Sequence, residues 1–169
     1  MFIVFEGIDG SGKSTASRKL KDYYGDDAIL ISMPSGLPTG LEVRKEINNI
    51  NSDDIKIKDL LIDDFNNLIK EVIRPALDLG KIVICDRYIQ SFIAYQSVML
   101  SEEIVQESLK KIDLIEPDVV FLLDIEPEIA LSRINREKDS IEKKGINFFN
   151  KVRNKFIELN KLVLYNVES

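Results

Sequence analysis

The stretch Phe2–Thr15, FIVFEGIDGSGKST, restricts the fold of this chain more than any other stretch. The short apolar run Phe2–Phe5 is typical of a buried parallel strand, and the loop 7–14 after it fits the pattern G-x-x-x-x-G-K-[ST]. A helical stretch follows from Ser14 to about Tyr24. A strand, a glycine-rich loop and a helix in this order are the context that a phosphate-binding loop requires.

The loop 7–14, called the P-loop from here on, has the residues that phosphate binding needs. Glycines let the backbone wrap closely around phosphates, and the inward-facing N–H groups and the helix N-terminus attract anions. Lys13 supplies a positive charge for the β- and γ-phosphates, and Ser14 supplies a hydroxyl ligand for Mg²⁺. The predicted ATP-binding residues are Gly7, Ile8, Asp9, Gly10, Ser11, Gly12, Lys13, Ser14 and Thr15.

The composition restricts the class of protein. The 169 residues suit one domain, and 44% hydrophobic and 31% charged residues are ordinary for a globular protein. A net charge of −6 argues against a nucleic-acid coat or a binder of anionic membranes, and no apolar run is long enough to span a membrane. The single cysteine, Cys85, favours a cytoplasmic location. Because histidine is absent, any chemistry must use carboxylates, Lys, Arg and a hard cation.

Apolar strands alternate with helical segments along the rest of the chain. We expect strands at 28–31, 81–85, 117–124 and 162–166, helices near 41–50, 54–79, 127–136 and 146–161, and one or two helices over 89–112. Pro75 predicts a kink or a break in the longest helical pattern. The alternation indicates an α/β fold whose parallel sheet is covered by helices on both faces. Its ligands should bind at the carboxyl ends of the strands.

Asp86 and Arg87 follow the third expected strand and therefore lie at this binding edge. An arginine holds phosphate oxygens in a bidentate fork, and the carboxylate can hold Mg²⁺ through water or orient the arginine. The alternative is a surface ion pair without a function.

Arg133 and Arg136 are three residues apart on an expected helix and precede the charged segment 137–145. Either one is a candidate for a catalytic cation that closes over the transferring phosphoryl group. The alternative is a solvated helix end, where cations are favoured by the helix dipole.

A site without histidine favours an acceptor that is already ionised. A phosphate monoester ionises near neutral pH and needs no base, so catalysis then requires positioning and charge neutralisation. An alcohol acceptor would need a carboxylate base, for which Glu6 and Asp9 are the candidates.

Several segments resemble the thymidylate kinase family of P-loop nucleoside monophosphate kinases. These segments are FEGIDGSGKST (5–15), VIRPALDLGKIVICDRY (72–88), SFIAYQ (91–96), PDVVFLLDIEPEIALSRI (117–134) and FFNKVRNKF (148–156). The resemblance implies a single three-layer α/β/α domain over 1–169, with a five-stranded parallel sheet in the order 2-3-1-4-5 and a short lid at about 136–146. It also implies Mg²⁺-dependent phosphorylation of dTMP to dTDP by ATP, and a cytoplasmic homodimer.

The resemblance further implies roles for single residues that bind the acceptor. Asp9 resembles the carboxylate that meets the 3′-hydroxyl of the acceptor sugar, and Arg44 and Arg87 resemble the clamps on the acceptor phosphate. Tyr95 resembles the ring packed under the sugar, and Gln96 resembles the residue that hydrogen-bonds the base.

The position of the catalytic arginine divides the family, and Gly10 stands where one branch has a P-loop arginine. The chain therefore resembles the other branch, which uses lid arginines. The predicted catalytic residues are Lys13, Arg87, Arg133 and Arg136, and the predicted metal ligands are Ser14 and Asp86.

The chain departs from the family pattern where the family reads the base. Leu61 and Phe65 stand at the positions of a Phe and an Arg four residues apart, and Ser32-Met33-Pro34 replaces Arg-Glu-Pro. The usual Asp-Arg pair of the lid is Asp139-Ser140 here. Phe65 either supplies a stacking surface for the base or fills the core. These departures keep open a related kinase for dUMP, dCMP or a deoxynucleoside, and a nucleotide-binding regulatory protein with little turnover.

Overall fold

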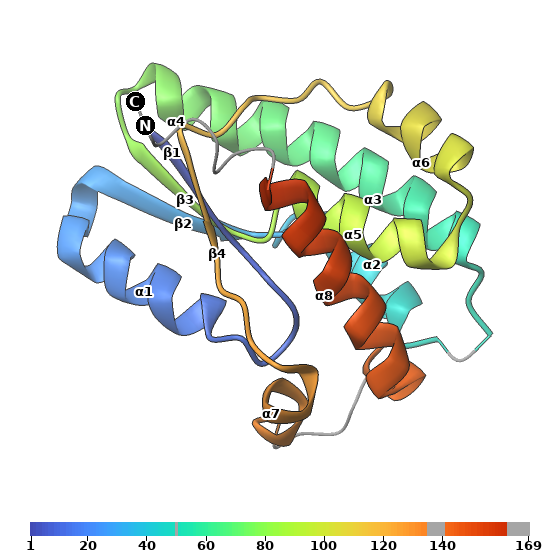
Figure 1. The fold of residues 1–169 in the computed structure, drawn as a ribbon. Helices are drawn as coiled ribbons and strands as arrows, with labels where there is room; N and C mark the ends of the chain where they lie inside the picture. Colours follow the sequence, from blue (N-terminus) through green and yellow to red (C-terminus); the bar gives the residue numbers. More distant parts are fainter. Residues whose placement is uncertain (50, 135–140, 162–169) are drawn as a thin grey trace.

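A parallel β-sheet lies at the centre of the computed structural model, which describes residues 1–49, 51–134 and 141–161 (Figure 1). The strands are β1 (Phe2–Glu6), β2 (Ala28–Ser32), β3 (Ile82–Asp86) and β4 (Val119–Leu122), in the order β2-β3-β1-β4. All three strand pairs are parallel, as the sequence predicted. The described part of the chain has four strands instead of the predicted five, because the last one, at 162–166, lies outside the described residues.

Side chains of the central strands alternate between two layers of helices, as the two-residue period of a strand requires. Phe2 and Val4 of β1 pack on one face against α3 (Asp54–Leu68), and Ile3 and Phe5 pack on the other face near α1 (Lys13–Tyr24). Burial of each such side chain contributes about 1.5–3 kcal/mol to folding. The two clusters therefore fix both faces of the sheet and place the P-loop between β1 and α1 (Figure 1).

The helical pattern at 54–79 is divided into three pieces. They are α3, the π-helical turn η2 (Ile69–Ile73) and α4 (Arg74–Asp78). Pro75 lies in the first turn of α4, directly after the π-helical turn. The backbone stays helical at both ends of that turn, so the helix is locally widened there and does not break.

The remaining helices complete the two layers around the sheet. They are α2 (Pro38–Ile47), α5 (Ile89–Met99), α6 (Glu102–Leu109), α7 (Pro127–Ser132) and α8 (Ile146–Lys161), with 3₁₀ turns η1 (Gly25–Asp27) and η3 (Glu142–Lys144). Helices α2 and α5 line a cavity at the binding edge of the sheet. Helix α8 packs along α5 through Phe149, Val152 and Phe156 (Figure 1). None of the helices in the described ranges is both long and apolar enough to cross a membrane.

Two predicted helix boundaries are wrong for local reasons. Helix α2 begins at Pro38 instead of Leu41, because proline is well suited to the first turn of a helix. Helix α7 ends at Ser132 instead of near Arg136, and Arg133 is its C-cap residue. The N–H of Arg133 bonds to the carbonyl of Ala130, three residues back, which tightens and closes the last turn. Arg136 lies outside the described residues, so the predicted shared helix face of Arg133 and Arg136 stays a prediction.

Candidate functional site

A cavity of about 1590 Å³ opens at the carboxyl ends of the strands. It is bounded by the P-loop, the loop after β2, helices α2, α3 and α5, and the segment after α7. The predicted site residues in its wall are Asp9, Gly10, Gly12, Lys13, Ser14, Thr15, Arg44, Leu61, Phe65, Asp86, Arg87, Tyr95, Gln96 and Arg133. The other P-loop residues, Gly7, Ile8 and Ser11, lie behind that wall. The cavity thus gathers residues from distant parts of the sequence at the predicted edge of the sheet.

The P-loop adopts left-handed backbone angles at its glycines. The φ angles are 140° at Gly7, 79° at Gly10 and 99° at Gly12. A Cβ at Gly10 would overlap the backbone of Ala130 in α7. An arginine at this position would therefore require α7 to move, which agrees with the predicted absence of a P-loop arginine.

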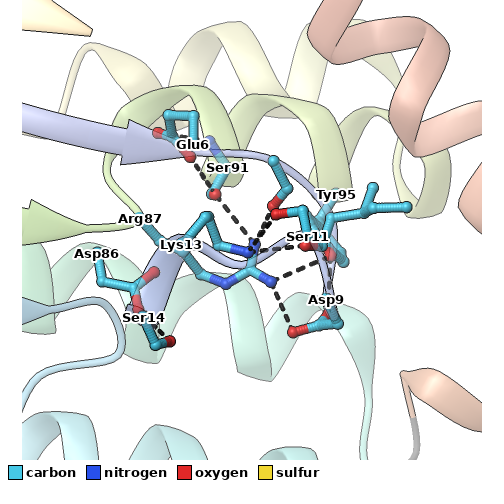
Figure 2. Close-up of polar contacts among 11 residues, drawn as sticks. Glu6, Asp9, Ser11, Lys13, Ser14, Asp86, Arg87, Ser91 and Tyr95 are labelled. Atoms are coloured by element: carbon cyan, nitrogen blue, oxygen red, sulfur yellow. Dashed lines mark hydrogen bonds and ion pairs between the residues drawn. The ribbon is translucent and has the colours of Figure 1, made fainter. Parts of the chain in front are cut away.

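Lys13 is 5% exposed and folds back on the P-loop. Its Nζ donates hydrogen bonds to the Ile8 carbonyl at 2.7 Å and to Ser11 Oγ at 3.4 Å (Figure 2). Burial, together with the nearby charge of Arg87, lowers the pKa of Lys13 to about 7. Phosphate oxygens in the loop would favour the charged form again.

Arg87, Asp9 and Tyr95 form a closed polar cluster beside Lys13 (Figure 2). Arg87 Nη2 is 2.6 Å from Asp9 Oδ1, and the Tyr95 hydroxyl donates to Asp9 Oδ2 at 2.8 Å. The guanidinium carbon of Arg87 lies 5.2 Å from the centre of the Tyr95 ring. Burial alone would raise the pKa of Asp9, but the charges of Arg87 and Lys13 outweigh it and the pKa is lowered. Burial raises the pKa of Tyr95, so the phenol stays protonated.

Ser14 and Asp86, the two predicted metal ligands, meet across the mouth of the P-loop. Ser14 Oγ donates to Asp86 Oδ2 at 2.5 Å (Figure 2). Two oxygen donors fit Mg²⁺, which usually takes its other ligands from water and substrate phosphates. No group of three or more His, Cys, Asp or Glu side chains gathers as a metal site in the described ranges.

Two uncharged residues of the predicted acceptor site are deeply buried. Gln96 is 2% exposed, and within the described part of the chain its Oε1 has no hydrogen-bond partner. Phe65 is 1% exposed and makes edge-to-face contacts with Tyr88 and Phe92. Phe65 therefore fills the core, and its stacking on a base stays a prediction. Leu61 is half-buried in the same wall of the cavity.

The two other predicted arginines that the structure describes are exposed at the cavity rim. The guanidinium of Arg44 donates to the Pro34 carbonyl and, at 3.3 Å, to Ser32 Oγ. Arg133 Nη1 is 3.5 Å from the Gly10 carbonyl. The predicted lid at 136–146 is described only from residue 141 onward, so Arg136, Asp139 and Ser140 lie outside the described residues.

Sequence reasoning missed two contacts next to the site. Ser91 lies between Glu6 and Arg87 and contacts both side chains (Figure 2). Arg153 of α8 makes a bidentate pair with Asp124 at 2.7 and 2.9 Å, which fixes α8 to the loop after β4. Ser91 lies in the segment SFIAYQ, and Arg153 lies in the segment FFNKVRNKF. Both segments resemble the family, and this resemblance could have pointed to the two residues.

Comparisons with known proteins show the family of this chain. The family model for thymidylate kinase matches residues 5–167. The thymidylate kinase of Wolbachia pipientis wMel is 39% identical over 94% of this chain and 84% of its own length. That of Thermosipho melanesiensis is 38% identical over 95% of this chain and 84% of its own length.

Solved structures give the same result. The crystal structure of thymidylate kinase from Ehrlichia chaffeensis superposes with a TM-score of 0.74 at 28% identity, over 95% of this chain and 81% of that one. The Candida albicans thymidylate kinase gives a TM-score of 0.81 at 26% identity, over 93% of this chain and 76% of that one. Sequence and structure together place this chain in the thymidylate kinase family.

Proposed function

We propose that this protein transfers the γ-phosphoryl group of ATP to dTMP and so forms dTDP and ADP. The observation that carries the proposal is the meeting of Lys13 in the P-loop with the Asp9–Arg87–Tyr95 cluster in one cavity. The P-loop suits the phosphates of the donor, and the cluster suits a phosphorylated sugar. Membership of the family supports ATP and dTMP as the substrates.

The donor phosphates would be held by the P-loop N–H groups and by Lys13, and Thr15 would lie beside them at the start of α1. Mg²⁺, when bound between Ser14 and Asp86, would neutralise charge on the phosphates. Arg133, or Arg136 from the proposed lid, would add a positive charge at the transferring group.

The acceptor would be held by its phosphate, its sugar and its base. Arg87 and Arg44 would bind the phosphate, and Asp9 would accept a hydrogen bond from the 3′-hydroxyl while the Tyr95 ring packs under the sugar. Gln96 Oε1 is a buried acceptor with no described partner, and the N3–H of thymine is a donor of the kind that it requires. Since the acceptor phosphate is already ionised, the reaction needs no general base.

The resemblance is also the support for three further proposals, which are a single domain over 1–169, a homodimer and a cytoplasmic location. Light scattering on the purified protein tests the oligomeric state directly, and a monomeric mass would contradict the homodimer.

The decisive experiment offers ATP and Mg²⁺ with dTMP, dUMP, dCMP and thymidine in parallel, and measures the phosphorylated products. We expect dTDP to form with the highest kcat/KM. A preference for dUMP, dCMP or thymidine would instead identify a related kinase with another acceptor. Binding of ATP without any phosphorylated product would identify a regulatory protein.

A further inference from the structure

A chain of hydrogen bonds, called the relay from here on, holds the Arg87 guanidinium in place. It runs from the Glu6 carboxylate through Ser91 to Arg87. We infer that Glu6, which does not line the cavity, and Ser91, which lines it beside Arg87, are positioning residues that orient the Arg87 guanidinium toward the acceptor phosphate. The inference rests on the proposed function, because it assumes that Arg87 binds the acceptor.

Glu6, the last residue of β1, is fully buried and has three hydrogen-bond donors around it. Its Oε1 accepts the N–H of Tyr88 at 2.9 Å and the N–H of Ser91 at 3.1 Å. Its Oε2 accepts the Ser91 hydroxyl (Figure 2). All three donors come from the junction between β3 and α5. One carboxylate therefore ties the end of β1 to the turn that carries Arg87.

That turn needs such support because Arg87 has an unfavourable backbone conformation. Its φ angle is 73°, and in the described part of the chain it is the one residue other than glycine with a positive φ. A side chain with a Cβ is disfavoured there, so the surrounding contacts must hold the residue in place. The bonds from Glu6 to the residue directly after Arg87 and to the first turn of α5 supply these contacts.

The relay continues from the backbone to the guanidinium group. Arg87 Nη1 donates to Ser91 Oγ at 3.2 Å and to the Gly7 carbonyl at 3.0 Å. Ser91 Oγ can accept this bond because its own proton is directed to Glu6. The order of donation is then Arg87 to Ser91 to Glu6, and it fixes Nη1 while Nη2 faces Asp9 in the cavity.

The test compares Ser91→Ala with Ser108→Ala, a matched change of a buried serine on a helix remote from the site. Ser108 is 1% exposed, and among the described residues its hydroxyl donates to the Ile104 carbonyl of the same helix. We expect Ser91→Ala to raise the KM for dTMP about tenfold, as the loss of one hydrogen bond to a charged group should, and to leave the KM for ATP unchanged. Ser108→Ala should change neither value.

A double-mutant cycle with Arg87→Ala separates positioning from general loss of structure. If Ser91 acts through Arg87, adding Ser91→Ala to Arg87→Ala should cause no further loss of kcat/KM. Glu6→Gln is the second variant, because its amide oxygen keeps the two backbone bonds while its NH₂ group no longer accepts the Ser91 proton; it should also raise the KM for dTMP and spare that for ATP.

The outcomes distinguish the inference from the function on which it rests. A strong loss in Arg87→Ala with a Ser91→Ala enzyme that matches Ser108→Ala, or with additive losses in the cycle, overturns the relay. Equal rises in the KM for ATP and dTMP also overturn it. An Arg87→Ala enzyme with normal kinetics contradicts the proposed clamp itself.

Discussion

Burial disfavours the charged form of Lys13. Its pKa of about 7 lies well below the ordinary value, so between these two pKa values the native state binds fewer protons than the unfolded state. Below pH 7, burial of the charged Lys13 amine therefore lowers the free energy of unfolding by its full amount. The free energy of unfolding should rise as the pH increases toward about 10. A bound phosphate reverses this preference for the neutral amine, because its negative charge favours the protonated form of Lys13 and raises its pKa.

The first prediction follows from that reversal. ATP binding near pH 8.5 should take up close to one proton per site, since Lys13 is mostly neutral before binding and charged after it. Titration calorimetry in two buffers of different ionisation enthalpy measures the uptake. Lys13→Met should abolish it. A binding enthalpy of the unchanged protein that is independent of the buffer would show that Lys13 is already charged.

The second prediction concerns Gln96, whose replacement should lower activity without lowering stability. Replacement by Met removes an amide oxygen that has no partner among the described residues, so the melting temperature should stay the same or rise. The KM for dTMP should nevertheless increase about tenfold, because the base loses its hydrogen-bond acceptor. Thermal denaturation and steady-state kinetics measure the two effects. A large loss of stability would show that the amide has a structural role.

At the scale of elements, a buried carboxylate fixes the loop after β2 to α3. Asp64 is fully buried and accepts hydrogen bonds from the Ser35 N–H at 2.7 Å and from Thr39 Oγ1 at 2.9 Å, together with one from the Ser35 hydroxyl. The sequence predicted α3 from its apolar period. It did not predict the connection of α3 to this loop, because nothing in a helical pattern identifies the partner of a buried Asp.

The third prediction uses two neighbouring aspartates of α3. Asp64→Ala should lower the free energy of unfolding by about 2–4 kcal/mol, because three donors would be left buried without an acceptor. Asp63 is exposed on the same helix, and Asp63→Ala should change stability by less than about 0.5 kcal/mol. Urea denaturation measures both values. Equal effects of the two changes would contradict the structural role of Asp64.

The fourth prediction concerns the contact between the P-loop and α7. Gly10→Ala places a Cβ on the Ala130 backbone, whereas a Cβ at Gly25 has nothing within 4 Å, and both glycines have a positive φ. Gly25→Ala should therefore cost about 1 kcal/mol from backbone strain alone. Gly10→Ala should cost about 1–3 kcal/mol more and weaken ATP binding. Denaturant unfolding and ATP titration measure the two effects, and equal losses of stability would refute the crowding at Gly10.

At the scale of the whole molecule, the sequence predicted the features that depend on residues close together along the chain. The apolar runs predicted β1 to β4, and the glycine spacing predicted the P-loop. The resemblance assigned Asp9, Arg87 and Tyr95 to the acceptor site, and in the structure their side chains contact one another. The π-helical turn and the early end of α7 depend on how turns close against neighbouring segments, and no residue pattern records that. The relay through Ser91 likewise joins segments about 85 residues apart in sequence.

The closed Asp9–Arg87–Tyr95 cluster has a consequence for which molecules can enter the site. An anion that binds Arg87 competes with the Asp9 carboxylate for the guanidinium. Inorganic phosphate would take the arginine and leave the half-buried Asp9 carboxylate without its nearest counterion, which is unfavourable. A nucleotide gives each member of the Asp9–Arg87 pair a new partner. Its phosphate binds the arginine, and its sugar hydroxyl donates a hydrogen bond to the carboxylate. Because the charges of Asp9 and Arg87 balance each other, the site should prefer ligands that carry both an anionic group and a hydroxyl group at the right separation.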